Sequence, residues 1–189
     1  MINKEIEILF KKLIPTDATN IIPFDNYRVF VYNYQGKTIV KTFDGIVLCE
    51  NANKVQMHNK GFSFVDCNNC YVVKNYNNEI IFKTKTKPKI YNDYVILEEN
   101  NKYTVKTWDN YLACFDVEEV KIYNNLCCYR PYNEWFINDF YKKEIIMMCI
   151  DKVYYLDGCL FIRTGEYEYL LKNVSSTDTY FCLELGNNK

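Results

Sequence analysis

The sequence contains one Cys-X-X-Cys motif, formed by Cys67 and Cys70, and a single histidine, His58. A Cys-X-X-Cys pair can act as a redox couple or as half of a structural zinc site. A zinc site needs two further ligands, and no second motif of this kind exists in the sequence. The two cysteines flank an Asn-Asn pair, which is typical of a hairpin turn. We therefore interpret them as cross-strand neighbours beside a turn and predict no metal site and no cofactor.

Hydrolytic chemistry has only partial support in the sequence. A Ser-His or Cys-His nucleophile needs a histidine base within reach, and His58 lies in a predicted turn where it is expected to be solvated. A glycosidase needs two facing carboxylates, and Asp116, Glu118 and Glu119 cluster in the stretch DVEE. The short repeats described below leave little room for a deep glycosidase pocket. The sequence therefore favours a non-enzymatic protein, with a glycosidase-like enzyme as the third hypothesis.

The composition indicates a globular β-rich chain. Its 189 residues include 18 Tyr and 12 Phe but only 6 Gly and 4 Pro, and aromatic residues favour strands. A net charge of -1 disfavours a broad nucleic-acid interface, which needs a basic face. Nine cysteines without a signal peptide or a long apolar stretch suggest the reducing cytoplasm and no membrane association. The many Asn, Lys, Ile and Tyr residues suggest an AT-rich coding sequence, as in a low-GC bacterium, its phage or a large DNA virus.

A degenerate repeat runs through most of the chain. The stretch TIVKTFDG at 38–45 recurs at 71–78 and 103–110, and in weaker form at 135–142 and 169–176. The fourth residue of each copy is Lys41, Lys74, Lys106, Asn138 and Lys172, in steps of 33, 32, 32 and 34 residues. A second landmark, KIYND at 89–93, has relatives at 54–61, 121–125 and 152–158 with the same spacing. Two landmarks in phase indicate a repeat protein.

Within each repeat the apolar residues alternate with a period of two, and Asn or Asp pairs mark the turns. About 32 residues then form four short strands, which cannot bury their faces alone. We predict an all-β fold, a five-bladed β-propeller, with an open β-repeat stack as the alternative. The fifth repeat ends one strand short by this phase, so residues 20–24 are predicted to pair with it and close the ring.

The expected domain organisation has two parts. Residues 1–18 are predicted to form an amphipathic helix and a linker, because Ile6, Leu9, Phe10 and Leu13 follow a helical spacing. Residues 19–189 are predicted to form the β-repeat domain.

The repeats resemble the short bacterial repeats named after a Trp-Gly (WG-type) pair. The resemblance covers residues 27–185 and rests on the stretches YVVKNYNNEIIF, YTVKTWDNYLAC and EWFINDFYKKEIIM. Neither Trp108 nor Trp135 is followed by Gly, and most repeats use Tyr or Phe instead. The resemblance implies an interaction module and transfers no catalytic residue.

Three groups of residues are candidate binding residues. Asn77, Asn78, Asp109 and Asn110 belong to turns that are expected to share one polar face with other Asn and Asp turns. Arg130, Tyr132 and Trp135 lie in the stretch YRPYNEW and are types enriched at interface hot spots, although Trp135 can equally be a core residue. The third group, Lys83, Lys85 and Lys87, alternates before Pro88. This group can form a basic face that binds phosphate or an acidic partner. The alternative, which we favour, is that the alternating lysines and Pro88 protect a sheet edge from aggregation.

The first hypothesis is therefore that the chain is a protein-binding module that acts in the cytoplasm. A phage or viral origin would make it a candidate antagonist of a host factor in the host cytoplasm. The alternative is a propeller that binds a small ligand, a carbohydrate or a nucleotide, at equivalent pockets between blades. Phe43, Tyr76, Trp108 and Phe140 recur where such pockets could form, although core packing is the expected role of these rings.

Overall fold

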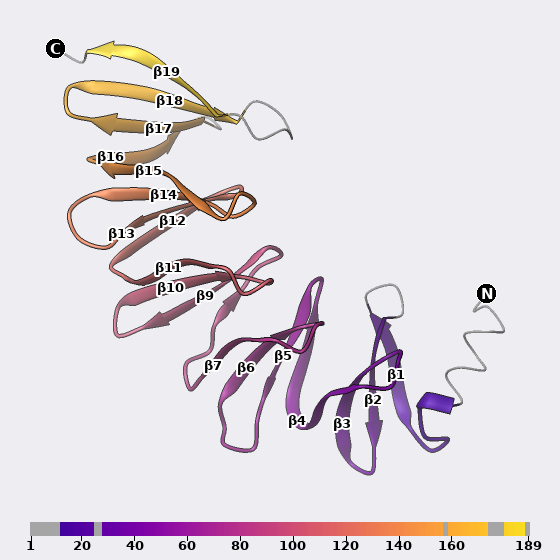
Figure 1. The fold of residues 1–189 in the computed structure, drawn as a ribbon. Helices are drawn as coiled ribbons and strands as arrows, with labels where there is room; N and C mark the ends of the chain where they lie inside the picture. Colours follow the sequence, from indigo (N-terminus) through magenta and orange to yellow (C-terminus); the bar gives the residue numbers. More distant parts are fainter. Residues whose placement is uncertain (1–11, 25–27, 157–158, 174–179, 188–189) are drawn as a thin grey trace. The chain divides into compact units, whose positions relative to one another are not determined.

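The computed structural model describes residues 12–24, 28–156, 159–173 and 180–187. In this part of the chain the secondary structure is antiparallel β, apart from a helical turn at Lys12 and Leu13 (Figure 1). The predicted all-β class is therefore confirmed. Most of the predicted N-terminal helix lies outside the described residues, so the helix stays a prediction.

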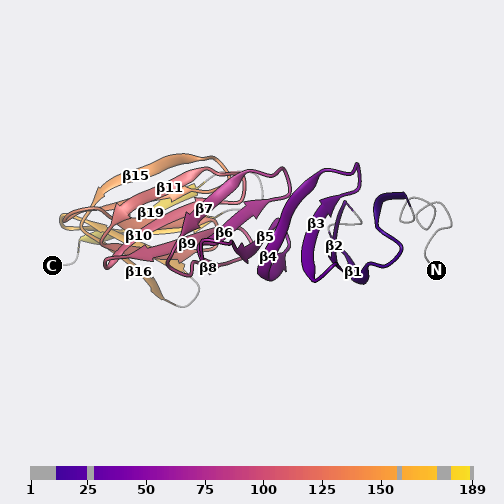
Figure 2. The same cartoon turned by 90° about the horizontal axis from the view of Figure 1, so that it is seen from below.

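The first sheet has seven strands that follow one another in chain order, from β1 to β7. The strands are β1 (Thr19–Phe24), β2 (Val29–Tyr34), β3 (Lys37–Thr42), β4 (Val47–His58), β5 (Gly61–Val65), β6 (Tyr71–Asn75) and β7 (Ile80–Thr84). The long β4 serves two repeats, because its first half pairs with β3 and its second half pairs with β5. Figure 2 shows β4, β5 and β6 side by side.

Three four-stranded sheets follow, in the orders β11-β10-β9-β8, β12-β13-β14-β15 and β16-β17-β18-β19. The first comprises β8 (Lys89–Ile90), β9 (Tyr94–Glu99), β10 (Lys102–Thr107) and β11 (Leu112–Val117). The second comprises β12 (Glu119–Tyr123), β13 (Leu126–Arg130), β14 (Trp135–Asp139) and β15 (Glu144–Ile150). The third comprises β16 (Lys152–Leu156), β17 (Cys159–Thr164), β18 (Tyr167–Asn173) and β19 (Tyr180–Asn187).

The chain divides into two compact units. Unit 1 comprises Met1–Val95 with Trp108–Asn110, and unit 2 comprises Ile96–Thr107 with Tyr111–Lys189. In unit 1 the core gathers residues such as Val29, Val40 and Phe62 from β2, β3 and β5. In unit 2 the core gathers residues such as Ile137 and Ile162 from β14 and β17. Every residue of β5 is buried, so both faces of this strand are covered, as the prediction of mutually packed sheets requires.

The phase of the repeat differs from the prediction. Strands β8, β12 and β16 carry the second landmark, KIYND or a relative of it, and are called KIY-type strands below. Each was predicted to be the fourth strand of the preceding repeat, but each pairs with the strand that follows it. The connections explain this pairing. Asn124 and Asn125 form a two-residue hairpin turn between β12 and β13, whereas only Glu118 separates β11 from β12. One residue is too short for a hairpin, so the chain passes to the next sheet at this point.

The observed phase also changes the strand content of the fifth repeat, which was predicted to lack one strand. The last sheet contains four strands of its own, β16 to β19, and therefore does not lack a strand. In place of the predicted ring-closing pairing, the strand at 20–24 pairs with β2, for example Ile22 with Val31. It stands where the KIY-type strands stand in the other sheets, and no sheet of the described residues is closed on itself.

A β-bulge recurs in the last strand of successive repeats. In the first repeat Val40 pairs with Cys49 but Lys41 pairs with Val47, so Leu48 has no cross-strand partner. The equivalent bulged residues are Ile81, Ala113 and Ile146. Each bulge thus lies opposite the fourth residue of the TIVKTFDG-type landmark.

The fourth landmark residue satisfies a carbonyl that a bulge leaves unpaired. Within unit 1, the Lys74 ammonium donates a hydrogen bond to the Leu48 carbonyl at 3.0 Å. Within unit 2, the Asn138 amide donates one to the Ala113 carbonyl at 3.1 Å. A buried carbonyl without a partner is costly, so a donor is needed at this position of the repeat. The repeated Lys and Asn residues are therefore explained by packing between repeats.

Candidate functional site

The polar turns between the last two strands of the first three repeats are built alike. In unit 1 the Asn75 side-chain oxygen accepts a hydrogen bond from the Glu79 backbone amide at 2.9 Å. The Asn75 backbone amide in turn donates to the Glu79 carbonyl at 3.1 Å. Thr42 and Thr107 act in the same way on Ile46 and Tyr111. The tip residues Gly45, Asn78 and Asn110 have φ values of 92°, 69° and 64°, which Gly and Asn tolerate. The predicted turns are confirmed.

The repeated aromatic residues join these turns to the first hairpin of the same repeat. The Trp108 indole donates to the Tyr91 carbonyl at 3.0 Å, and the Phe140 amide donates to the Asn125 carbonyl at 2.9 Å. Trp108 and Phe140 are buried, whereas Phe43 and Tyr76 are half-buried. In the third and fourth repeats the two kinds of turn therefore lie at the same end, as predicted, and the aromatic rings mainly pack.

A groove of about 550 Å³ lies between the turns of the first two repeats in unit 1. Its walls include the predicted residues Asn77 and Asn78, together with Asp44 from the preceding turn and Arg28. The rings of Phe43 and Tyr76 and the aliphatic Val29, Ile46 and Leu48 supply the apolar part. Asp109 and Asn110 occupy the equivalent turn of the third repeat and do not line this groove.

The two asparagines of the groove differ in their freedom. Asn78 accepts a hydrogen bond from the Lys74 ammonium at 2.8 Å, so its side chain is held by the fold. Asn77 lies at the exposed tip of the turn. Asn77 is therefore the better candidate for contact with a ligand or a partner.

The lysine run connects two sheet edges. Lys83 lies in β7, one residue before its end, and its ammonium lies 3.0 Å from the Asp66 carboxylate. This hydrogen bond raises the pKa of Lys83, and the Cys70 amide and Lys83 together lower the pKa of Asp66. Lys85 and Lys87 are exposed in the segment between β7 and β8, the edge strands of two sheets. This position is compatible with the edge-protection interpretation.

The three residues of the stretch YRPYNEW lie in different environments. Trp135 is 4% exposed and belongs to the core of unit 2. The Lys121 ammonium lies 4.4 Å from the centroid of a Trp135 ring, and the Arg130 guanidinium carbon lies 5.6 Å from it. Arg130 also pairs with Glu119 at 2.9 Å. Only Tyr132, at 82% exposure, is a free aromatic side chain of the kind predicted.

The Cys-X-X-Cys motif forms the predicted hairpin turn between β5 and β6. The Asp66 carboxylate accepts hydrogen bonds from the backbone amides of Asn68 and Cys70, both at 2.9 Å. The described residues contain no group of three or more His, Cys, Asp or Glu side chains that could hold a metal ion. The paired cysteines Cys127 and Cys128 are both fully buried in β13, as predicted for packing residues, and burial raises the pKa of Cys128 to about 12.

His58 is not the solvated turn residue that the sequence suggested. Its Nε2 atom lies 3.1 Å from the Ser63 hydroxyl, and its ring packs at 5.8 Å from that of Trp108. Burial lowers the pKa of His58. Sequence reasoning missed the contact because Ser63 comes from the neighbouring strand. Since Ser63 is only 9% exposed, the contact is a structural cross-strand hydrogen bond.

The lowered pKa of His58 predicts a loss of stability in acid. The unfolded chain binds the proton more readily than the folded protein, so the free energy of unfolding falls as the pH drops below about 6.5, the unfolded value. The loss continues down to the folded pKa. Urea unfolding between pH 5 and 8 measures the slope, and His58→Gln should flatten it in this range. An equal slope in the variant would show that other groups cause the loss.

The wider comparisons identify no family for the chain. No protein-family model matches the sequence, and no curated protein is similar to it in sequence. The structure is similar to Kluyveromyces lactis Hsv2 over 82% of this chain and 60% of that chain, at 7% identity and a TM-score of 0.32. It is also similar to the Myceliophteria thermophila Cps50 (Swd1) beta-propeller domain, over 87% of this chain and 69% of that domain, at 7% identity and a TM-score of 0.32.

A third similar structure is the N-terminal domain of Nup159, which matches over 92% of this chain and 64% of that domain, at 10% identity and a TM-score of 0.32. The chain thus spans less than two thirds of the Hsv2 and Nup159 structures. In the described part of the chain, no helix has the length and hydrophobicity needed to cross a membrane.

Proposed function

We propose that this chain is a non-enzymatic module that binds another protein through the last strands of its repeats. The supporting observation is a solvent-facing aliphatic residue at the same position of four repeats. Val47, Ile80, Leu112 and Ile145 are 45%, 48%, 46% and 44% exposed. Each pairs across its sheet with the fourth landmark residue, Lys41, Lys74, Lys106 or Asn138.

The exposure of these side chains has no evident role in the fold. Their neighbours in the same strands, such as Leu48 and Ile81, are buried and already fill the core. Further apolar side chains are exposed on the last strands of unit 2, where Phe115 is 69% and Met148 is 58% exposed. Exposed apolar surface that recurs at one structural position is typical of protein interfaces.

We further propose that the repeats are the blades of a five-bladed propeller. The strand pattern supports five units of four strands, if β4 is counted in the first two. The alternative is an open stack of the same sheets.

A capture experiment with matched variants tests the protein-binding function. The full chain is expected to retain one partner at a fixed ratio from cells of its natural host. Replacing Val47, Ile80, Leu112 and Ile145 with lysine should reduce capture about tenfold or more, because it removes apolar contact area and adds buried charge to the interface. Size-exclusion chromatography with light scattering measures the ratio.

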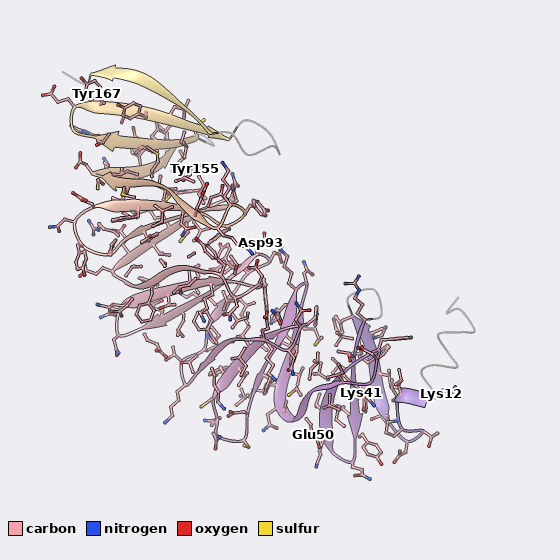
Figure 3. All side chains as sticks on the ribbon, in the orientation of Figure 1. Lys12, Lys41, Glu50, Asp93, Tyr155 and Tyr167 are labelled. Atoms are coloured by element: carbon pink, nitrogen blue, oxygen red, sulfur yellow. The ribbon has the colours of Figure 1, made fainter. Side chains whose placement is uncertain are left out.

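The matched control is Tyr167→Lys. Tyr167 lies in β18 and is 43% exposed, so it has similar exposure but does not occupy the repeated position (Figure 3). The control variant should retain the partner. Equal losses in the control and in the fourfold variant, or no reproducible partner for the native chain, would contradict the proposal.

The second candidate function is small-ligand binding in the groove of unit 1. The volume of about 550 Å³ lies within the range of small-molecule pockets, and the walls combine two aromatic rings with amide and carboxylate groups. This combination suits a carbohydrate better than a nucleotide. A glycosidase has less support, because Asp44 is the only carboxylate among the lining residues. Saturable sugar binding that Asn77→Ala abolishes would favour the ligand function over protein binding.

We also propose that the protein acts in a reducing compartment. The cysteines whose side chains the structure describes, all but Cys182, are free, and Cys49, Cys114, Cys127 and Cys128 are buried. Thiols of this kind persist in the cytoplasm. Origin in a phage or virus and antagonism of a host factor stay predictions from composition alone.

A further inference from the structure

Unit 1 contains a second, smaller cavity of about 120 Å³. Lys54 and Gln56 of β4, Ser63 of β5 and Tyr71 of β6 line it, and Lys87 approaches from the segment that leads into β8. Phe64 and Pro88 supply apolar wall. This cavity is well below the 300–1,000 Å³ or so that is usual for small-molecule pockets, so it suits a single small polar group.

The charge of the cavity is positive and uncompensated. Among the described residues, neither the Lys54 nor the Lys87 side chain has a hydrogen-bond or ion-pair partner, and no lining residue is Asp or Glu. Asp66 directly follows the lining residue Val65. Its carboxylate pairs with the Lys83 ammonium and accepts hydrogen bonds from the backbone amides of its own turn. Two lysines that face one cavity without a carboxylate favour an anion.

The backbone positions one of these lysines in an unusual way. Lys54 has a φ of 53°, in the left-handed region, and lies where the pairing of β4 with β5 shifts between Asn53 and Gln56. Such β-bulges re-aim side chains and are frequent next to functional sites. The local backbone therefore directs Lys54 away from the regular alternation of β4.

The hydroxyl groups of the cavity can act as donors toward the same anion. The Ser63 oxygen lies 3.1 Å from His58 Nε2. When Nε2 carries the hydrogen, it donates to Ser63, and the Ser63 hydroxyl is then available to donate into the cavity. Tyr71 contributes a second hydroxyl group from β6.

We propose that this cavity binds a phosphate-class oxyanion, held by the ammonium groups of Lys54 and Lys87 and by the hydroxyl groups of Ser63 and Tyr71. Lysine binds phosphate as a point charge, and a tetrahedral oxyanion accepts hydrogen bonds on several sides. The anion can be free in solution or carried by a phosphorylated side chain. This site is separate from the last-strand surface and does not depend on the proposed protein-binding function.

Titration of the full chain with inorganic phosphate, followed by amide NMR, tests the site. Saturable shifts are expected at Lys54, Ser63 and Lys87, with acetate and chloride at equal ionic strength producing none of them. Lys54→Ala and Lys87→Ala should each weaken phosphate binding about tenfold, the usual effect of losing one hydrogen bond to a charged group. The control is Lys85→Ala, an exposed lysine of the same run that does not line the cavity, which should bind like the native chain.

A phosphoserine peptide distinguishes the two sources of the anion. Tighter binding of the peptide than of inorganic phosphate would identify a phosphorylated side chain as the ligand, and equal or weaker binding would identify the free anion. The proposal is overturned if the Lys54→Ala, Lys87→Ala double variant binds phosphate like the native chain. It is also overturned if Lys85→Ala causes the same loss or if acetate produces the same shifts.

Discussion

Gly61→Ala should lower the free energy of unfolding by about 3 kcal/mol, an effect at the upper end of those caused by overpacking. Gly61 begins β5 in unit 1 and is buried. A Cβ atom at this position would lie 2.2 Å from the Lys74 carbonyl oxygen, 2.5 Å from Cζ3 of Trp108 and 2.9 Å from Cα of Asn75. Two of these three atoms are backbone, so a rotamer change cannot relieve the contacts.

The same contacts join three strands and a turn, which makes the effect larger. Gly61 pairs with His58 in β4 and with Asn75 in β6. The Asn75 side-chain amide donates a hydrogen bond to the Trp108 carbonyl at 2.9 Å, so a shift of β6 also strains the turn that contains Trp108. In a chain of this length, the expected loss corresponds to a decrease of roughly 6–12 °C in the melting temperature.

Thermal and urea unfolding of Gly61→Ala measure this loss, and Gly36→Ala and Gly165→Ala are the matched controls. Apart from the glycine itself and its two chain neighbours, no heavy atom lies within 4 Å of a Cβ at either control position. Both controls have positive φ, at 74° and 59°, and should lose only about 1 kcal/mol through backbone strain. A loss at Gly61 no larger than in the controls would show that the strands separate easily at this point.

The sequence was sufficient to predict the strands, the turns and the spacing of the repeat. Alternating apolar residues and Asn or Asp pairs are local signals, and Asn78 and Asn110 do adopt positive φ. The phase of the repeat was predicted wrongly, because a KIY-type strand can pair on either side and periodicity alone does not choose. The single residue Glu118 between β11 and β12 was the signal that could have decided it.

The roles of individual side chains were harder to predict, because they depend on contacts between repeats. Lys74 and Asn138 recur at one landmark position, but their role became visible only with the bulged carbonyls of Leu48 and Ala113. Ser63 gave no signal in the sequence, since its partner His58 lies on another strand. The exposed positions of the last strands were equally hidden, because an apolar residue in a strand is normally predicted to be buried.

Trp135→Ala should lower the free energy of unfolding by about 3–5 kcal/mol, whereas Tyr132→Ala should change it by no more than about 0.5 kcal/mol. The two aromatic residues are three positions apart but 4% and 82% exposed. Trp135 packs in the core of unit 2 with residues such as Ile137 and Ile150, and truncation would leave a cavity there. Urea unfolding of the two variants measures the difference.

The same pair of variants separates stability from binding in the stretch YRPYNEW. Tyr132→Ala leaves the fold intact, so any loss of partner capture by this variant would place Tyr132 in an interface. A loss of capture in Trp135→Ala has no such meaning, because the core is disturbed. Phe is the conservative replacement: Trp135→Phe should restore most of the stability, because an aromatic ring still fills the space beneath Lys121 and Arg130. If Trp135→Ala proved as stable as the native chain, the indole would be a surface group and the original hot-spot interpretation would hold.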